Sequence, residues 1–446
     1  MRKLSRLLQV SSLILTIILA PILSACSLFS GRDAHTIIFW TSVTNDIDVA
    51  AQQQIISAFE QTNPQWHVRL VREPSQGTGD ATALITAVRG GTPPDVYLLD
   101  RFSISQQAAI GLLSDLKPFI SKYSPDLARH YLPFAWREAS YQGDPYGLPM
   151  DTDARALFYN TDLLRQAGID PGILAPEHGP PTIAEVMRLG ERLDKTDAHG
   201  NYTQLGLIPW GGQGFHTTWA LSFGAHFYDA RTCQVTMTEP ALQKTFHYFV
   251  SWAKALNYKK VDTFLATYQP PNAPPSQTPF LTGHLGMAIE GNWLLQNIQH
   301  YAPDLHYGVT YLPVEQRGDR PFTWSGGFAL VMPKGAYNTE GGYRFMSFMA
   351  GPEGQRIYTR LAGQLPTWTA LLEQTDEFHG PQRFFTNMLK FAISRPPLPV
   401  GAQISDALDT AQQAVLLGTQ TPIQALQQAQ QRVQPQMQQY CPYGNH

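Results

Sequence analysis

Two aspartates separated by one residue, Asp151 and Asp153, are the first candidates for chemistry in this sequence. On an extended chain alternate side chains point the same way and lie about 6.5 to 7 Å apart. Two carboxylates at that spacing can accept hydrogen bonds from hydroxyl groups. They could also flank a glycosidic bond that is cleaved, which requires roughly 5 to 10 Å. A salt bridge with Arg155 is the structural alternative.

Further polar candidates stand where strands are expected to end. Asp100 follows a β-rich run, Trp40 ends the first such run in the chain, and Asn45 lies just beyond it. Ligands of α/β proteins usually bind beyond the carboxyl ends of the strands, so we expect these side chains near a site. Asp100 could instead cap the next helix. Arg101 could orient Asp100 or face solvent.

Aromatic residues beside glycines form a second group of candidates. Flat rings pack on the CH face of a sugar, and glycines let backbone N–H groups approach a ligand closely. Trp293 follows a Gly-Asn pair, and Trp324 precedes a Ser-Gly-Gly run. Two further aromatic residues belong to a glycine-rich loop. The candidates of this group are Trp210, Phe215, Trp293, Trp324, Gly326 and Gly327.

Several kinds of chemistry find no support in the sequence. The 13 histidines show no metal-like spacing, and no phosphate-binding loop or nucleophile elbow occurs. We therefore expect no metal, no cofactor and no catalytic residue. The formal net charge of −3 argues against a nucleic-acid partner.

The beginning of the chain has the pattern of a lipoprotein signal peptide. Basic residues precede an apolar stretch from Leu13 to Leu23, which is too short to span a bilayer as a mature helix. A small residue then precedes Cys26. We expect cleavage after residue 25, a lipid on Cys26 and a linker over residues 26–35. The mature protein would be exported and tethered to the outer face of the cell membrane.

Two further cysteines, Cys233 and Cys441, remain after Cys26 is assigned to the lipid. Exported proteins meet an oxidising compartment, in which thiols pair, so we expect a disulfide between these two. Two separate buried thiols are the alternative.

Strand and helix patterns alternate along the chain. This order predicts a mainly parallel sheet with helices on its faces, an α/β fold. Thr182 with Glu185 and Thr421 with Gln424 form capping boxes at the starts of two later helices. The first expected elements are a strand at 36–40, a helix at 47–62, a strand at 67–71, a helix at 82–89 and a strand at 95–99.

Several stretches, in one order and at matching spacing, resemble the family 1 extracellular solute-binding proteins of ABC importers, the group that contains the maltose- and trehalose-binding proteins. The resemblance runs from about Thr36 to about Gln434. It rests on Thr36–Trp40, Phe59–Pro64, Gly91–Asp100, Ala109–Leu116, Tyr146–Asn160, Phe280–Trp293, Trp324–Leu330 and Gly351–Gly354.

The resemblance implies two α/β lobes, each a mainly parallel sheet flanked by helices, joined by a hinge with the ligand in the cleft between them. The first lobe would comprise residues 36–149 and 309–350. The second would comprise residues 150–308 and 351–446. The chain would cross between the lobes near Leu148–Asp153 and near His306–Gly308.

The resemblance also implies roles for some candidates. Asp100 matches a position that commonly carries a sugar-binding aspartate, and Trp293 one that commonly carries a stacking aromatic. One of Asp151 and Asp153 would contact the ligand. Arg395 resembles another contact position, although a structural role before Pro396-Pro397 is the alternative.

The function implied is capture of a sugar or sugar-like polyol for import, by a monomer that hands the ligand to the importer's permease subunits. Two other functions remain open: binding of a charged solute such as glycerol phosphate, and glycoside hydrolysis by paired carboxylates. A structural lipoprotein that binds no solute is a further, weaker alternative.

Overall fold

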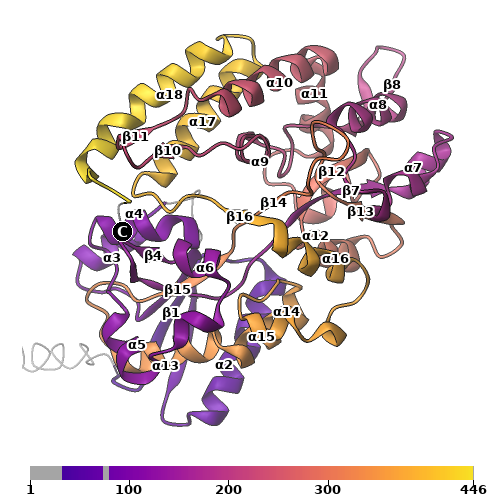
Figure 1. The fold of residues 1–446 in the computed structure, drawn as a ribbon. Helices are drawn as coiled ribbons and strands as arrows, with labels where there is room; N and C mark the ends of the chain where they lie inside the picture. The colour runs from indigo at the N-terminus through magenta and orange to yellow at the C-terminus, as the bar shows by residue number, and fades with distance from the viewer. Residues whose placement is uncertain (1–32, 74–79, 445–446) are drawn as a thin grey trace, which may run out of the picture.

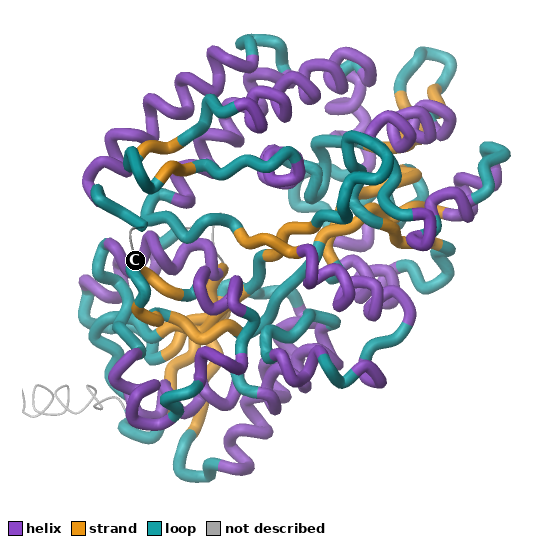
Figure 2. The backbone as a smooth tube through the Cα atoms, viewed as in Figure 1, coloured by secondary structure: helices purple, strands orange, loops and turns teal. Residues whose placement is uncertain are grey.

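The structure, a computed structural model, describes residues 33–73 and 80–444 of the 446-residue chain. The expected signal peptide and the lipid site at Cys26 lie outside the described residues. Figure 1 shows two lobes, and Figure 2 shows the longer strands gathered into one group within each lobe. This is the two-lobed α/β fold that the sequence predicts.

The first lobe is built on a five-stranded sheet with the order β2-β1-β3-β15-β6. The three strands from the start of the chain are parallel, and β15 runs antiparallel to both of its neighbours. The elements are β1 (Thr36–Thr41), α2 (Asp46–Thr62), β2 (His67–Arg72), α3 (Thr82–Arg89), β3 (Val96–Asp100), α4 (Ile104–Ala109), α5 (Lys117–Tyr123), α6 (Pro133–Glu138), β4 (Ser140–Tyr141), β5 (Asp144–Pro145), β6 (Gly147–Pro149), β15 (Phe328–Val331), α13 (Thr339–Met349) and α14 (Pro352–Ala362).

Apolar spacing explains how this lobe forms its core. Ile37 and Phe39 of β1 are fully buried, and Ile55 and Phe59 of α2 pack into the same cluster. Asn45 caps α2, because its side chain accepts a hydrogen bond from the N–H of Asp48. The five elements predicted at the start of the chain are confirmed within one residue at every end.

The second lobe contains a five-stranded sheet with the order β13-β7-β12-β9-β8. The two predicted capping boxes are present at the starts of α8 and α18. The elements are β7 (Arg155–Asn160), α7 (Thr161–Gln166), α8 (Ile183–Leu193), β8 (Lys195–Thr196), β9 (Tyr202–Leu207), α9 (His216–Ser222), β10 (Tyr228–Asp229), β11 (Gln234–Val235), α10 (Pro240–Leu256), α11 (Tyr258–Tyr268), β12 (Leu285–Gly291), α12 (Leu294–Tyr301), β13 (Tyr307–Thr310), β14 (Thr323–Ser325), α16 (Gly380–Met388), β16 (Ala392–Ser394), α17 (Gly401–Leu416) and α18 (Pro422–Met437).

The chain crosses between the lobes three times, and only the first crossing lies near its expected position. The first crossing follows β6, close to where it was predicted. The second was expected at His306–Gly308, but β13 pairs with β7 of the second lobe along its whole length. The chain returns only at Gly326–Gly327, between β14 and β15. A strand pattern alone could not reveal which sheet β13 joins.

The third crossing also lies later than predicted. Residues after 350 were assigned to the second lobe, yet α14 packs against α2, and Tyr358 is buried in the first-lobe core. The chain enters the second lobe between α14 and α16, whose Phe385 and Met388 pack around Phe158 of β7. The short helix α15 (Thr369–Leu372) lies on this connection.

The C-terminal segment is fastened to the second lobe. Cys233 and Cys441 form a disulfide with their Cα atoms 6.0 Å apart. Tyr443, next to it, donates a hydrogen bond from its hydroxyl to the carbonyl oxygen of Pro397 at 2.6 Å. Its ring stacks on Tyr141 of the first lobe, with centroids 6.0 Å apart. Within residues 33–73 and 80–444, no helix is long and apolar enough to cross a membrane.

Candidate functional site

A cavity of about 370 Å³ lies between the lobes, next to the first two crossings. Eight of the thirteen candidate ligand-binding residues line it. The first lobe contributes Val43, Asn45, Ile47, Asp48, Asp100, Phe328, Ala362 and Gln364, the crossings contribute Asp151, Asp153, Gly326 and Gly327, and the second lobe contributes Arg155, Pro275, Trp293, Gln296, Asn297 and Arg395.

Asp100 lies at the end of β3, as the sequence predicts. Its Oδ1 atom accepts hydrogen bonds from the N–H of Phe102 at 2.9 Å and from Arg395 Nη2 at 2.7 Å. Asp100 therefore caps the short helical turn that follows, which was the structural alternative, and it also lines the cavity. Its Oδ2 atom accepts no hydrogen bond from the described residues.

The two crossing aspartates are held in the same way. Asp151 Oδ1 accepts from the N–H of Phe328 at 2.6 Å, and Asp153 Oδ1 accepts from the N–H of Gly326 at 2.6 Å. Asp153 Oδ1 also pairs with Arg155, the expected salt bridge. In both aspartates Oδ2 has no partner among the described residues. Burial raises the pKa of Asp151 well above its usual value.

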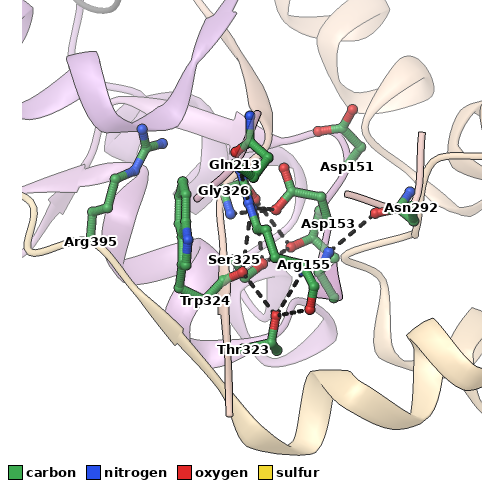
Figure 3. A network of polar contacts seen from close by, with 12 residues as sticks. Asp151, Asp153, Arg155, Gln213, Asn292, Thr323, Trp324, Ser325, Gly326 and Arg395 are labelled. Carbon is green, nitrogen blue, oxygen red and sulfur yellow. Dashed lines mark hydrogen bonds and ion pairs between the residues drawn. The ribbon is translucent and has the colours of Figure 1, made fainter. Parts of the chain in front are cut away.

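Arg155 lies against an aromatic ring rather than in open solvent. Its guanidinium sits 3.4 Å from the centre of the Trp324 ring and 5.2 Å from that of Trp293. Figure 3 shows Arg155 beside Trp324, with Asp153 next to its guanidinium. Burial lowers the pKa of Arg155 to about 10, and the Asp153 carboxylate opposes that shift. Arg155 remains charged at neutral pH.

Trp324 was predicted to stack on a ligand, but its position in the structure does not allow this. It is only 1% exposed and does not line the cavity. Its indole N–H donates to Thr218 Oγ1 at 2.7 Å, and Phe215 packs edge-on against the ring. With Arg155 over its face, Trp324 supports the cavity wall from behind.

Trp293, in contrast, lines the cavity and is partly exposed. Its ring lies over Gly291, where a Cβ atom would collide with it. The glycine in the Gly-Asn pair is therefore needed for the position of this tryptophan.

Arg101 is fully buried and serves the crossings instead of the ligand. Its Nε atom pairs with Glu138 at 3.0 Å, and its terminal nitrogens donate to the carbonyl oxygens of Asp151 and Gly326. A Cβ atom at Gly327, which has a φ of 126°, would collide with this guanidinium. Neither proposed role of Arg101 is correct, because it ties the two crossings together.

The two glycines were expected to offer N–H groups to a ligand. Both line the cavity, but the N–H of Gly326 is used by Asp153. Gly327 instead allows Arg101 to approach the backbone closely, whereas a Cβ atom at Gly326 would meet Arg395 Nη2 at 3.3 Å.

Three other aromatic candidates do not line the cavity. Trp40 packs edge-on against Tyr97 inside the first lobe. Trp210 is 8% exposed and belongs to the second-lobe core. Phe215 lines a small apolar pocket beside α17. Strand ends and glycine-rich loops do not reveal which way a ring turns.

Five polar lining residues were not among the candidates, and one of them, Arg155, was expected only as a salt-bridge partner. Gln296 and Asn297 lie three and four residues after Trp293, so the helical period could have placed them on its face. Asp48 could have been found from the cap that it forms with Asn45. Gln364 carries no local signal, because it reaches the cavity only through the return of α14. The described residues include no group of His, Cys, Asp or Glu that could hold a metal ion.

Residues 42–356 match the family described as bacterial extracellular solute-binding protein. This match covers well over half of the chain, and the chain belongs to that family.

Individual relatives share less than a quarter of their aligned residues with this chain. The chain is 24% identical over 427 residues to the sn-glycerol-3-phosphate-binding periplasmic protein UgpB of Salmonella paratyphi A, covering 89% of this chain and 91% of the relative. It is 23% identical over 346 residues to a maltooligosaccharide ABC transporter solute-binding lipoprotein of Streptococcus pneumoniae, covering 75% and 74%. Among solved structures, CpMnBP1 with mannobiose bound has a TM-score of 0.79 at 24% identity, covering 89% of this chain and 99% of that one.

Proposed function

We propose that this protein binds a carbohydrate between its lobes and delivers it to an ABC importer. The proposal depends on how the carboxylate oxygens of Asp100, Asp151 and Asp153 are hydrogen-bonded. Each carboxylate is fixed through Oδ1 by protein donors, and within residues 33–73 and 80–444 its Oδ2 atom has no partner. Fixed acceptors around a partly exposed tryptophan suit a ligand with many hydroxyl groups and apolar CH faces.

The charge of the cavity argues against a phosphorylated ligand, although one relative is named for glycerol phosphate. Arg155 and Arg395 line the cavity, and each is already paired with an aspartate. No lysine occurs among the described lining residues. A phosphate would need donors with spare positive charge, so the site favours a neutral ligand.

We propose binding without hydrolysis. A glycosidase needs one carboxyl group to donate a proton and a second to act as nucleophile or base. Asp153 is paired with Arg155, and Asp151 is held by a backbone N–H. The family consists of solute-binding proteins, which agrees with this assignment.

We also propose that Cys26 carries the lipid, that the body is monomeric on the outer face of the cell membrane, and that the permease subunits read lobe closure. The disulfide of Cys233 with Cys441 supports an oxidising compartment. We propose that the lobes divide at the three crossings, which lie after β6, at Gly326–Gly327, and between α14 and α16.

Thermal unfolding with a panel of solutes tests the function. A ligand present at 100 times its dissociation constant stabilises the native state by about 2.7 kcal/mol. We expect a shift with neutral saccharides and none with sn-glycerol 3-phosphate. A shift with the phosphate alone would refute the proposal. Chromatography of the saccharides after incubation should recover them unchanged.

A further inference from the structure

The segment that follows α18 lies against both lobes. Figure 1 shows it running from the end of α18 to the junction of the lobes, beside α4. Its first fixed point is Cys441, which the disulfide joins to Cys233, and Tyr443 follows two residues later. We call residues 441–444 the C-terminal strap.

The strap is anchored to the second lobe through the turn between β10 and β11, which carries Cys233. Gln434 of α18 holds the same turn. Its Nε2 atom donates to the carbonyl oxygen of Cys233 at 3.1 Å, and its Oε1 atom accepts from the N–H of Val235 at 2.8 Å. The turn is therefore fixed to α18 without the disulfide, whereas the disulfide is the covalent link that holds the strap against the turn.

Tyr443 is enclosed by residues of both lobes and is only 8% exposed. On the second-lobe side its hydroxyl donates to the carbonyl oxygen of Pro397 at 2.6 Å. Its own carbonyl oxygen accepts from the hydroxyl of Tyr228 at 2.9 Å. On the first-lobe side its ring stacks on Tyr141 of β4, with centroids 6.0 Å apart and planes 28° apart. One side chain thus joins the two lobes.

The two segments that Tyr443 touches both adjoin the inter-lobe contacts. Tyr141 packs against apolar clusters of both lobes, and its hairpin, β4 with β5, leads directly into β6 and the first crossing. Pro397 lies two residues after Arg395, whose guanidinium pairs with Asp100 of the first lobe at 2.7 Å. A displacement of the strap would therefore be felt at both of these places.

We propose that the C-terminal strap holds the two lobes in the arrangement in which both line the cavity. Tyr443 acts as a positioning residue, because it ties the segment after Arg395 to the hairpin before the first crossing. An aromatic pair shifts an equilibrium by roughly two- to tenfold. Loss of the strap should therefore shift the ligand-free protein towards more open arrangements by about that factor. The proposal concerns the lobes alone and does not depend on the nature of the ligand.

Small-angle X-ray scattering and hydrogen exchange on the purified, ligand-free protein test the proposal. Replacing Cys233 and Cys441 by serine releases the strap and should raise the radius of gyration. The amides of the first-lobe hairpin, residues 140–147, should exchange about two- to tenfold faster, because the strap no longer covers Tyr141. A disulfide that served only the second lobe would leave this hairpin unchanged. Exchange in β1, in the core of the same lobe, is the internal reference.

Single substitutions separate the contact from the disulfide. Tyr141→Ala removes the first-lobe side of the contact and should raise the radius of gyration as much as the serine variant does. Combining the two should add nothing, because both remove the same interaction. Tyr443→Phe keeps the ring but loses the hydrogen bond to Pro397, so it should give a smaller rise. Tyr123→Ala, at the half-exposed end of α5 in the same lobe, is the matched control and should cause no change.

An unchanged radius of gyration in both the serine variant and Tyr141→Ala would overturn the proposal, and so would additive increases when the two are combined. Faster exchange in the hairpin without a change in size would reduce the strap to local packing and would also reject it. Tyr141→Ala decides the matter if the serine variant does not fold. Failure of every saccharide in the thermal panel would refute the proposed function and leave this proposal standing.

Discussion

Trp293 and Trp324 look alike in sequence, each beside glycines, yet the structure assigns them opposite roles. Trp293 faces the inter-lobe cavity, and Trp324 is 1% exposed behind it. A pyranose stacked on one indole face removes roughly 100 Å² of apolar surface from water, which at about 25 cal/mol per Å² is about 2.5 kcal/mol. Trp293→Ala should therefore weaken ligand binding about 60-fold, with little change in stability.

Trp324→Ala should act mainly on stability. Removal of a buried tryptophan typically costs about 3–5 kcal/mol of unfolding free energy, and here the loss also uncovers Arg155. Urea unfolding and calorimetric titration of both variants provide the measurement. Wild-type affinity for Trp293→Ala would remove the stacking role. A loss of affinity for Trp324→Ala greater than that for Trp293→Ala would show that the assignment is reversed.

Three further predictions follow from buried charges and the disulfide. Arg101→Met should cost about 3–5 kcal/mol of stability, because Glu138 loses its nearer buried partner and keeps only the longer pairing with Arg395 at 3.6 Å. Adding Glu138→Leu should recover part of that loss in urea unfolding. Replacing Cys233 and Cys441 by serine should lower the unfolding free energy by about 2–5 kcal/mol, because the bond closes a separation of 208 residues. Equal unfolding midpoints with and without reductant would contradict this. Burial raises the pKa of Glu290 from 4.5 to about 7, so the native state binds more protons than the unfolded chain between these values. Its contribution to stability should therefore fall as pH rises from about 4.5 to 7, and Glu290→Gln should flatten the pH dependence of the melting temperature over that range.

The parts of the fold that could be predicted depend on local rules. The first strand and the helix capped by Asn45 follow from apolar spacing and from a side chain that satisfies backbone N–H groups. The crossings could not be placed in this way. β13 has an ordinary strand pattern, and only its pairing with β7 shows which lobe it joins.

The site residues likewise separate into those that local rules could predict and those that depend on distant contacts. Asp100 and the two crossing aspartates line the cavity because strand ends and alternating side chains have a fixed geometry. Arg101 and Trp324 were misjudged, because their roles depend on partners more than 30 residues away in the chain: Glu138 for the first, Thr218 and Arg155 for the second. Residue type indicates what a side chain can bind, whereas burial decides whether it meets the ligand.

The way in which the aspartates are held would also link ligand binding to the lobe closure that we propose. Asp151 and Asp153 belong to the first crossing, and their Oδ1 atoms accept N–H groups of Phe328 and Gly326 at the second. A ligand hydroxyl on either Oδ2 is thus bound to both crossings at once. Hydrogen bonds to charged groups contribute about 1.5–3 kcal/mol each, whereas moving a two-state equilibrium from 1:99 to 99:1 requires about 5.5 kcal/mol. Three such bonds of about 2 kcal/mol each, made only when the lobes meet around the ligand, would reach that value.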